Sequence, residues 1–177
     1  DGKKELAIVT VWPMAVLYLY GYDGKRLPGW EGGKIIDHDQ YRSTGCFSYP
    51  VFGDIDGDTY LEVLVGSVGG KVYAFDRKGN NVPGWPRDTG KEAAVNTLAI
   101  GDMDGDSYPE VVAGVGGVIT ENPQDASNTL IKDYLYAWHG NGQLLSGWPV
   151  ETASALSGLD TLSSVAVPVI ADVNIDT

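Results

Sequence analysis

The sequence repeats itself at a fixed interval, and this periodicity constrains the fold more than any other feature. Residues 53–62 read GDIDGDTYLE and residues 101–110 read GDMDGDSYPE, so seven of ten positions are identical at a spacing of 48. A related element begins at Ala171 as ADVNIDT, and residues 1–5 align with the second half of the motif. Periods of about 20 to 50 residues are typical of architectures in which each repeat is one supersecondary unit. We therefore expect a chain of similar structural units.

A second element repeats in step with the first. Residues 17–30 (LYLYGYDGKRLPGW), 72–85 (VYAFDRKGNNVPGW) and 135–148 (LYAWHGNGQLLSGW) align without gaps. In each copy, alternating apolar and polar residues lead into a turn rich in Gly, Asn and Asp, and this pattern favours a β-hairpin. Elsewhere too the apolar residues form short runs separated by turn residues, a pattern of strands rather than helices.

Combined, the two elements predict a unit of four short antiparallel strands. In the best-defined copy we expect strands at 96–102, 110–115 and 135–140, and a fourth in the segment leading to Trp148. Four strands in a repeat of this length are typical of a β-propeller blade. The sequence thus predicts an all-β fold with about three blades of a larger ring.

The blade boundaries follow from the repeat. We place the blades at approximately 1–50, 51–98 and 99–168, with the start of another at 169–177. The stretches 31–50, 115–133 and 150–164 differ between copies, so we expect them to form loops between strands, where a propeller would meet its ligand.

The acidic motif has the form D-x-D-G-D-x-x-x-E, which concentrates oxygen ligands in one turn. Oxygen-only environments favour Ca²⁺ over Zn²⁺ or Cu²⁺. An EF-hand loop has its glycine at position 6 and its closing Glu at position 12, whereas these residues stand here at positions 4 and 9. The predicted ligands are Asp54, Asp56, Asp58, the Tyr60 carbonyl and Glu62 in one loop, and Asp102, Asp104, Asp106, the Tyr108 carbonyl and Glu110 in the other.

Both ends of the sequence carry parts of the same motif. Asp1 and Glu5 align with positions 5 and 9, and Asp172, Asn174 and Asp176 align with positions 1, 3 and 5. Because Asn174 replaces an Asp and Ile175 replaces the glycine, we expect a weaker or differently shaped site there. Three blades would leave exposed strand edges, since propellers typically use about four to eight. We expect either a fragment of a longer chain, which we favour, or an assembly of copies in which two make six blades.

The loop sequence, preceded in one copy by Phe52-Gly53, resembles the FG-GAP or VCBS-type repeat of integrin alpha subunits and many secreted bacterial proteins. The VYAFDRKGNNVPGWP segment is similar to blades of the bacterial group. The resemblance implies calcium-binding β-propeller blades, usually extracellular, that serve adhesion, carbohydrate or protein recognition, or accompany a catalytic domain.

The net charge argues against a nucleic-acid partner, and the length of the apolar runs argues against a membrane span. The formal net charge is −12, which opposes nucleic-acid binding, and no apolar run approaches the length of about 18 residues that a membrane span needs. Twelve of the 24 acids lie at motif positions, so the acidity is concentrated in predicted cation sites.

Other chemistry-bearing residues have weaker support. His38 and Cys46 share one insertion, but no companion motif supports a nucleophile pair, and a polar surface loop is the favoured interpretation. His139 is interpreted as a turn residue. Trp30, Trp85 and Trp148 recur at one blade position, which favours packing between blades over sugar stacking. Trp12, in a non-repeated segment, is a slightly better candidate for an exposed contact.

The sequence therefore predicts an extracellular, calcium-binding β-propeller module for adhesion or for recognition of a protein or carbohydrate ligand, without catalytic chemistry of its own. Two alternatives remain open. In the first alternative, the segment is the non-catalytic propeller of a secreted polysaccharide- or protein-degrading enzyme. In the second, it is a structural subunit of a surface or filament assembly.

Overall fold

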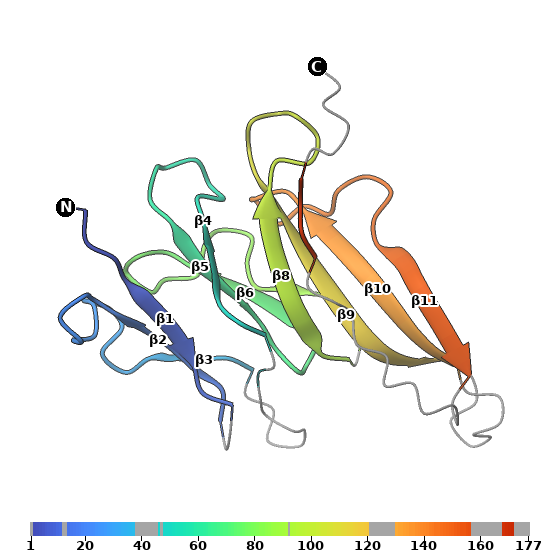
Figure 1. Cartoon of the computed structure of the whole chain (residues 1–177), viewed down its shortest axis with the longest axis horizontal. Helices are drawn as coiled ribbons and strands as arrows, with labels where there is room; N and C mark the ends of the chain where they lie inside the picture. The colour runs from blue at the N-terminus through green and yellow to red at the C-terminus, as the bar shows by residue number, and fades with distance from the viewer. Residues whose placement is uncertain are drawn as a thin grey trace.

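The computed structural model describes residues 2–11, 14–37, 46, 48–91, 93–120, 130–156 and 168–171. Within these ranges the helices and strands comprise β-strands alone, and the strands form three antiparallel sheets. Figure 1 shows the sheets side by side along the molecule, in chain order. The prediction of an all-β, blade-like fold is confirmed.

Within each sheet, neighbours in the chain are neighbours in space. The first sheet consists of β1 (Leu6–Val9), β2 (Val16–Tyr20) and β3 (Lys34–Ile35). The second consists of β4 (Val51–Gly53), β5 (Glu62–Gly66), β6 (Lys71–Phe75) and β7 (Arg87–Asp88). The third consists of β8 (Val95–Gly101), β9 (Glu110–Thr120), β10 (Leu130–Trp138) and β11 (Val150–Leu156).

The register shows which strands are equivalent. Leu6 pairs with Tyr20 in the first sheet, as Val63 pairs with Phe75 in the second. Strand β1 therefore corresponds to β5, and to β9 in the third sheet. Among the described residues, the first sheet has no strand corresponding to β4 and β8.

The fourth strand does not lie where the sequence predicted it. In the third sheet it is β11, which follows Trp148 instead of leading to it. The Trp148 N–H donates to the Leu145 carbonyl at 3.1 Å, and Trp138 forms an isolated bridge with Leu144. The chain thus makes a second turn at Trp148 before it can run back along β10.

All three expected loops contain strand residues, and in the 31–50 stretch these form β3 (Lys34–Ile35). Strands β9 and β10 extend into the 115–133 stretch, and β11 lies within 150–164. Gly116 and Gly117 occupy a β-bulge, where the register between β9 and β10 shifts between Lys132 and Tyr134. Gly117 has a φ of 78°, and its N–H donates to the buried Asp133 carboxylate at 2.9 Å. A bulge accepts such a glycine without ending the strand.

Two apolar cores form, and each includes residues from two adjacent sheets. Leu17 and Trp30 of the first unit pack in one cluster with Val63 and Val65 of β5. Leu64 and Val72 of the second sheet pack in the other cluster with Val111, Ala113 and Val115 of β9. Both faces of the second sheet therefore have covered apolar residues.

The first two Gly–Trp pairs each dock their unit onto the following one. The Trp30 indole N–H donates to the Arg77 carbonyl at 3.1 Å, and the Trp85 indole N–H donates to the Gly140 carbonyl at 2.8 Å. Each acceptor lies in the hairpin turn of the following sheet. The inter-blade role predicted for Trp30 and Trp85 is confirmed, whereas Trp148 is only half-buried.

The glycine before each docked tryptophan permits this approach. A Cβ at Gly29 would lie 2.0 Å from the Lys78 carbonyl oxygen, and one at Gly84 would lie 2.1 Å from the Asn141 carbonyl oxygen. Both glycines also have a φ near 90°. No side chain fits at either position without moving the neighbouring backbone.

We expect Trp85→Phe to lower the free energy of unfolding by about 2 kcal/mol, because the buried Gly140 carbonyl loses its donor. Trp148→Phe is the matched control and should change it by less than about 0.5 kcal/mol. Urea unfolding followed by intrinsic fluorescence measures both. Equal losses in the two variants would contradict a docking role specific to Trp85.

Candidate metal centres

The two acidic loops connect equivalent strands. The first acidic loop (residues 54–62) joins β4 to β5, and the second acidic loop (residues 102–110) joins β8 to β9. Both lie at the same end of their sheets, as Figure 1 shows. The sequence repeat is thus also a repeat in space.

The first acid of each loop organises the backbone around it. Asp54 accepts the N–H groups of Gly57 and Thr59 at 2.8 and 3.0 Å, through separate carboxylate oxygens. Asp102 accepts those of Gly105 and Ser107 at 2.7 and 3.0 Å in the same way. The two turns therefore have one conformation.

The backbone of these turns is left-handed at two positions. Gly57 and Gly105 have φ values of 78° and 80°, which glycine adopts at little cost. Thr59 and Ser107 have φ values of 74° and 72°, a region that residues with a side chain rarely adopt. The hydrogen bonds from Asp54 and Asp102 stabilise this conformation.

The acids at positions 3 and 5 lie next to the first. In the first acidic loop, oxygens of Asp54, Asp56 and Asp58 lie within 4.8 Å of one another. The Tyr60 N–H donates to Asp58 at 2.8 Å, so the backbone at position 7 is also close. Ligands bound to Ca²⁺ at about 2.4 Å are separated by distances of this order. An oxygen-only donor set of this kind fits Ca²⁺.

The glutamate at position 9 of each loop is buried and bonds to the backbone at the start of the loop. Glu62 and Glu110 are each only 1% exposed. Glu62 accepts the Ile55 N–H at 2.9 Å, and Glu110 accepts the Met103 N–H at 2.8 Å. These bonds connect the start of the second strand to the start of the loop.

Burial of the Glu62 carboxyl raises its pKa to about 7. The negative charges of Asp56, Asp58 and Asp54 add to the rise, and the hydrogen bond from the Ile55 N–H opposes it. A divalent cation among these acids would remove the repulsion and favour the ionised form.

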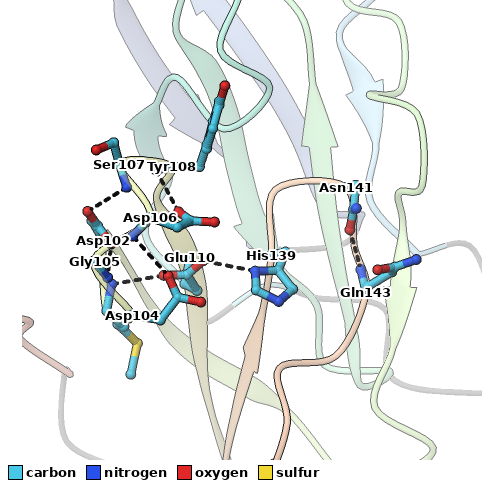
Figure 2. Close-up of polar contacts among 11 residues, drawn as sticks. Asp102, Asp104, Gly105, Asp106, Ser107, Tyr108, Glu110, His139, Asn141 and Gln143 are labelled. Atoms are coloured by element: carbon cyan, nitrogen blue, oxygen red, sulfur yellow. Dashed lines mark hydrogen bonds and ion pairs between the residues drawn. The ribbon is translucent and has the colours of Figure 1, made fainter.

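His139 lies next to the second acidic loop. The sequence analysis interpreted it as a turn residue and did not predict this contact. Its Nδ1 lies 3.1 Å from a Glu110 carboxylate oxygen. Donor atoms of Asp104, Asp106 and His139 lie within 4.8 Å of one another, and Figure 2 shows them converging. The sequence held one signal for this role, because His139 occupies the position of Asp76 in the preceding copy of an acid-rich repeat.

The second acidic loop offers a further, oxygen-only group. Oxygens of Asp102, Asp104 and Glu110 also lie within 4.8 Å of one another. This group includes the buried glutamate, whereas the corresponding group in the first acidic loop consists of its three aspartates. The two loops therefore present different ligand sets despite their shared backbone.

The remaining predicted ligands are placed as follows. The Tyr60 and Tyr108 side chains are exposed, and the Arg77 guanidinium lies 3.8 Å from the Tyr60 ring centroid. Glu5 is exposed, unlike its counterparts Glu62 and Glu110. The residues Asp1, Asp172, Asn174 and Asp176 lie outside the described residues, as do Trp12 and His38.

Cys46 is not part of a polar surface loop, and that interpretation was wrong for this residue. The residue is 1% exposed, and its one S–H lies within donating distance of two carbonyl oxygens, those of Ser48 and Gly66, at 3.2 and 3.0 Å from the sulfur. Burial raises its pKa to about 11, so the nucleophilic thiolate is disfavoured. Cys46 is a core residue.

A cavity of about 350 Å³ opens between the second and third sheets, beside both acidic loops. Its polar lining comes from Asp56 of the first acidic loop, Asp106 and Tyr108 of the second, and His139 and Asn141 of the adjoining turn. Acids of both loops thus border one concave surface.

The sheets and loops define an all-β protein of blade-like units that carry acidic turns between their first two strands. Comparison with protein families matches residues 54–113 to the FG-GAP-like repeat. The match supports an FG-GAP-type repeat in this stretch, which extends from the first acid of the first acidic loop into β9. The comparison with curated proteins gave no match. None of the described segments forms an apolar helix long enough to cross a bilayer.

In the presence of a chelator, we expect the free energy of unfolding to fall as the pH rises from about 5 to about 7.5. The unfolded chain loses the Glu62 proton near pH 4.5 and the folded chain only near 7, so deprotonation favours unfolding across this interval. Glu62→Gln should weaken this dependence, because the amide oxygen still accepts the Ile55 N–H without titrating. Exposed Glu151→Gln is the control. Parallel pH profiles for wild type and Glu62→Gln, from urea unfolding, would contradict the assignment.

Proposed function

We propose that this protein is an extracellular, calcium-binding β-propeller module that recognises a protein or carbohydrate ligand and has no catalytic activity of its own. The observation that carries the proposal is the convergence of Asp54, Asp56 and Asp58 on one point in a backbone already ordered around it. The FG-GAP-type repeat supports the same conclusion.

The electrostatics of the first acidic loop favour a divalent cation. Its three aspartates are next to one another and to the buried Glu62, so their mutual repulsion destabilises the loop until a positive charge enters. Carboxylate oxygens are the ligands that Ca²⁺ prefers, and sites in extracellular modules bind it with dissociation constants of about 0.1 to 1 mM. The calcium concentration outside cells suits such a site.

The ion would have a structural role in this proposal. Bound among Asp54, Asp56 and Asp58, it would hold the turn between β4 and β5, and with it one wall of the cavity that Asp56 lines. A concave surface with a few polar groups is the usual form of a ligand site. We infer that the cavity contacts the ligand, and that the net charge of −12 keeps nucleic acids away.

With dissociation constants of about 0.1 to 1 mM, we expect 1 mM Ca²⁺ to stabilise the metal-free protein by about 0.4 to 1.4 kcal/mol for each occupied site, which would appear as a rise in melting temperature. Asp56→Asn should reduce this rise, because it removes one charged ligand while keeping the shape of the side chain. The matched control is Asp23→Asn, an exposed acid in the hairpin turn of the first sheet. Isothermal titration calorimetry with Ca²⁺ gives the number of sites. An unchanged melting curve with and without EDTA would overturn the proposal.

A further inference from the structure

A larger cavity, of about 600 Å³, also lies between the second and third sheets. Its walls come from residues 87–91, which include β7, and from β10 with its hairpin turn. Its charged lining consists of two cations, Arg87 and Lys91, and one acid, Asp88. The whole chain has the opposite balance, with 12 Lys and Arg residues against 24 Asp and Glu residues. We call this space the basic cavity.

Arg87 lines the basic cavity without a polar partner among the described residues. Its Nε is buried, and no group in the described part of the chain accepts its proton. None of the ion pairs that the described residues form includes Arg87. A guanidinium is always charged in proteins, and burying part of a charged group without a hydrogen bond costs free energy. An anion beside Arg87 would offset this cost.

The guanidinium is held by packing on the next unit. A Cβ at Gly142, in the hairpin turn of the third sheet, would meet the Arg87 Nε and lie 2.8 Å from its Nη2. The turn therefore covers one side of the guanidinium, whereas the residue as a whole is half-buried and lines the cavity. A planar guanidinium that is already in place can bind a carboxylate through two N–H groups at a small cost in entropy.

The equivalent residue of the first sheet has a partner that Arg87 lacks. Lys34 lies opposite Leu17 in β2, as Arg87 lies opposite Val72 in β6. The Lys34 ammonium lies 5.6 Å from the Trp30 ring centroid. Of the contacts between cations and aromatic rings in the described ranges, none involves Arg87. Packing between units thus accounts for a cation at this position but does not supply Arg87 with a counter-charge.

The other charged lining residues leave room for one negative charge. The Lys91 ammonium lies 4.6 Å from the Tyr134 ring centroid and, within the described residues, forms no ion pair. The Asp88 carboxylate accepts the Gly90 N–H at 2.8 Å. Two cations against one acid give a net charge of about +1 in a chain of net charge −12. A ligand with many negative charges would be repelled by the rest of the surface.

The uncharged lining favours a peptide over a sugar. The two aromatic lining residues, Tyr136 and Trp138, are only 5% and 3% exposed, so neither presents an open face on which a sugar ring could stack. The Tyr136 hydroxyl donates to the Thr89 carbonyl at 2.7 Å, which joins β10 to the segment after β7. Leu144 and Pro149 are exposed at the rim. The cavity thus combines a fixed floor with an apolar rim.

One turn separates the basic cavity from the smaller cavity beside the acidic loops. His139 and Asn141 line the smaller cavity, and Gln143 and Leu144 line the basic one. Figure 2 shows His139 pointing toward the second acidic loop, and Gln143 farther from that loop on the same turn. A ligand that crosses this turn would meet acids on one side and cations on the other.

We propose that the basic cavity binds a single acidic side chain, Asp or Glu, of a peptide segment of a partner protein. Its carboxylate accepts hydrogen bonds from the Arg87 guanidinium and lies near the Lys91 ammonium. An apolar neighbour of that side chain packs on Leu144 and Pro149. This inference rests on the recognition function proposed above and specifies a protein ligand for it, but it does not depend on calcium.

Titration with short peptides, followed by NMR, tests the site. The peptides are the acetylated amides Gly-Leu-Glu-Gly and Gly-Glu-Leu-Gly, and the same two with Gln in place of Glu. The chain has four arginines, so Arg87→Lys identifies the Arg87 Nε–H signal by its loss. We expect this signal to shift with at least one Glu peptide at up to about 10 mM, and with neither Gln peptide. Equal shifts with Glu and Gln peptides, or no shift with either Glu peptide, would overturn the proposal.

Variants test the role of the two cations. The backbone amide signals of Gly142 and Gln143 report binding in every variant. Arg87→Gln should weaken binding of the Glu peptide at least tenfold, because a paired charge is lost, and Lys91→Gln about threefold. Arg87→Lys should lose less than Arg87→Gln, since it keeps the charge. Exposed Arg77→Gln, in the hairpin turn of the second sheet, is the matched control and should bind as the wild type does. Circular dichroism verifies folding, and wild-type affinity in folded Arg87→Gln would contradict the assignment.

Further results separate this inference from the function on which it rests. Glucuronate that shifts the Arg87 signal at lower concentration than the Glu peptides would overturn the choice of a peptide ligand. Peptide shifts at His139 and Asn141 with none at Arg87 would contradict the basic cavity alone and leave the recognition function in place. A shift at Arg87 in a protein that Ca²⁺ does not stabilise would support the basic cavity and contradict only the calcium proposal.

Discussion

The docking of Trp30 and Trp85, each with its preceding glycine, onto the backbone of the next unit is the contact on which the arrangement of the sheets depends. A buried indole that donates to a carbonyl gives the contact a direction as well as a hydrophobic area. The glycine before it allows the two backbones to approach within a distance that any side chain would prevent. The apolar clusters on either side of the second sheet lie between the units that are docked in this way.

The same sheets position the acidic loops. Glu62 and Glu110 lie at the first residue of a buried strand and bond to the backbone at the start of the loop. Each loop is therefore attached to its sheet at both ends. The aspartates then order the turn between these points, so the fold of the blade brings the carboxylates together.

The differences between the copies are as informative as the repeat. The first acidic loop brings three aspartates together, whereas His139 adds an imidazole to the second. An imidazole nitrogen is a ligand for softer divalent ions than Ca²⁺. Two loops with the same backbone can therefore differ in ion preference through one residue of a neighbouring hairpin, which sequence alignment of the loops alone does not include.

The repeat in the sequence was sufficient to predict the all-β units, the hairpins, the acidic loops and the inter-blade role of Trp30 and Trp85. These features depend on local patterns and on spacing, which a sequence contains directly. Only the tertiary structure placed the last strand of the third sheet after Trp148, buried Cys46, and brought His139 to Glu110. Each of these depends on contacts between segments far apart in the chain, where packing and burial, rather than local preference, determine which residues meet.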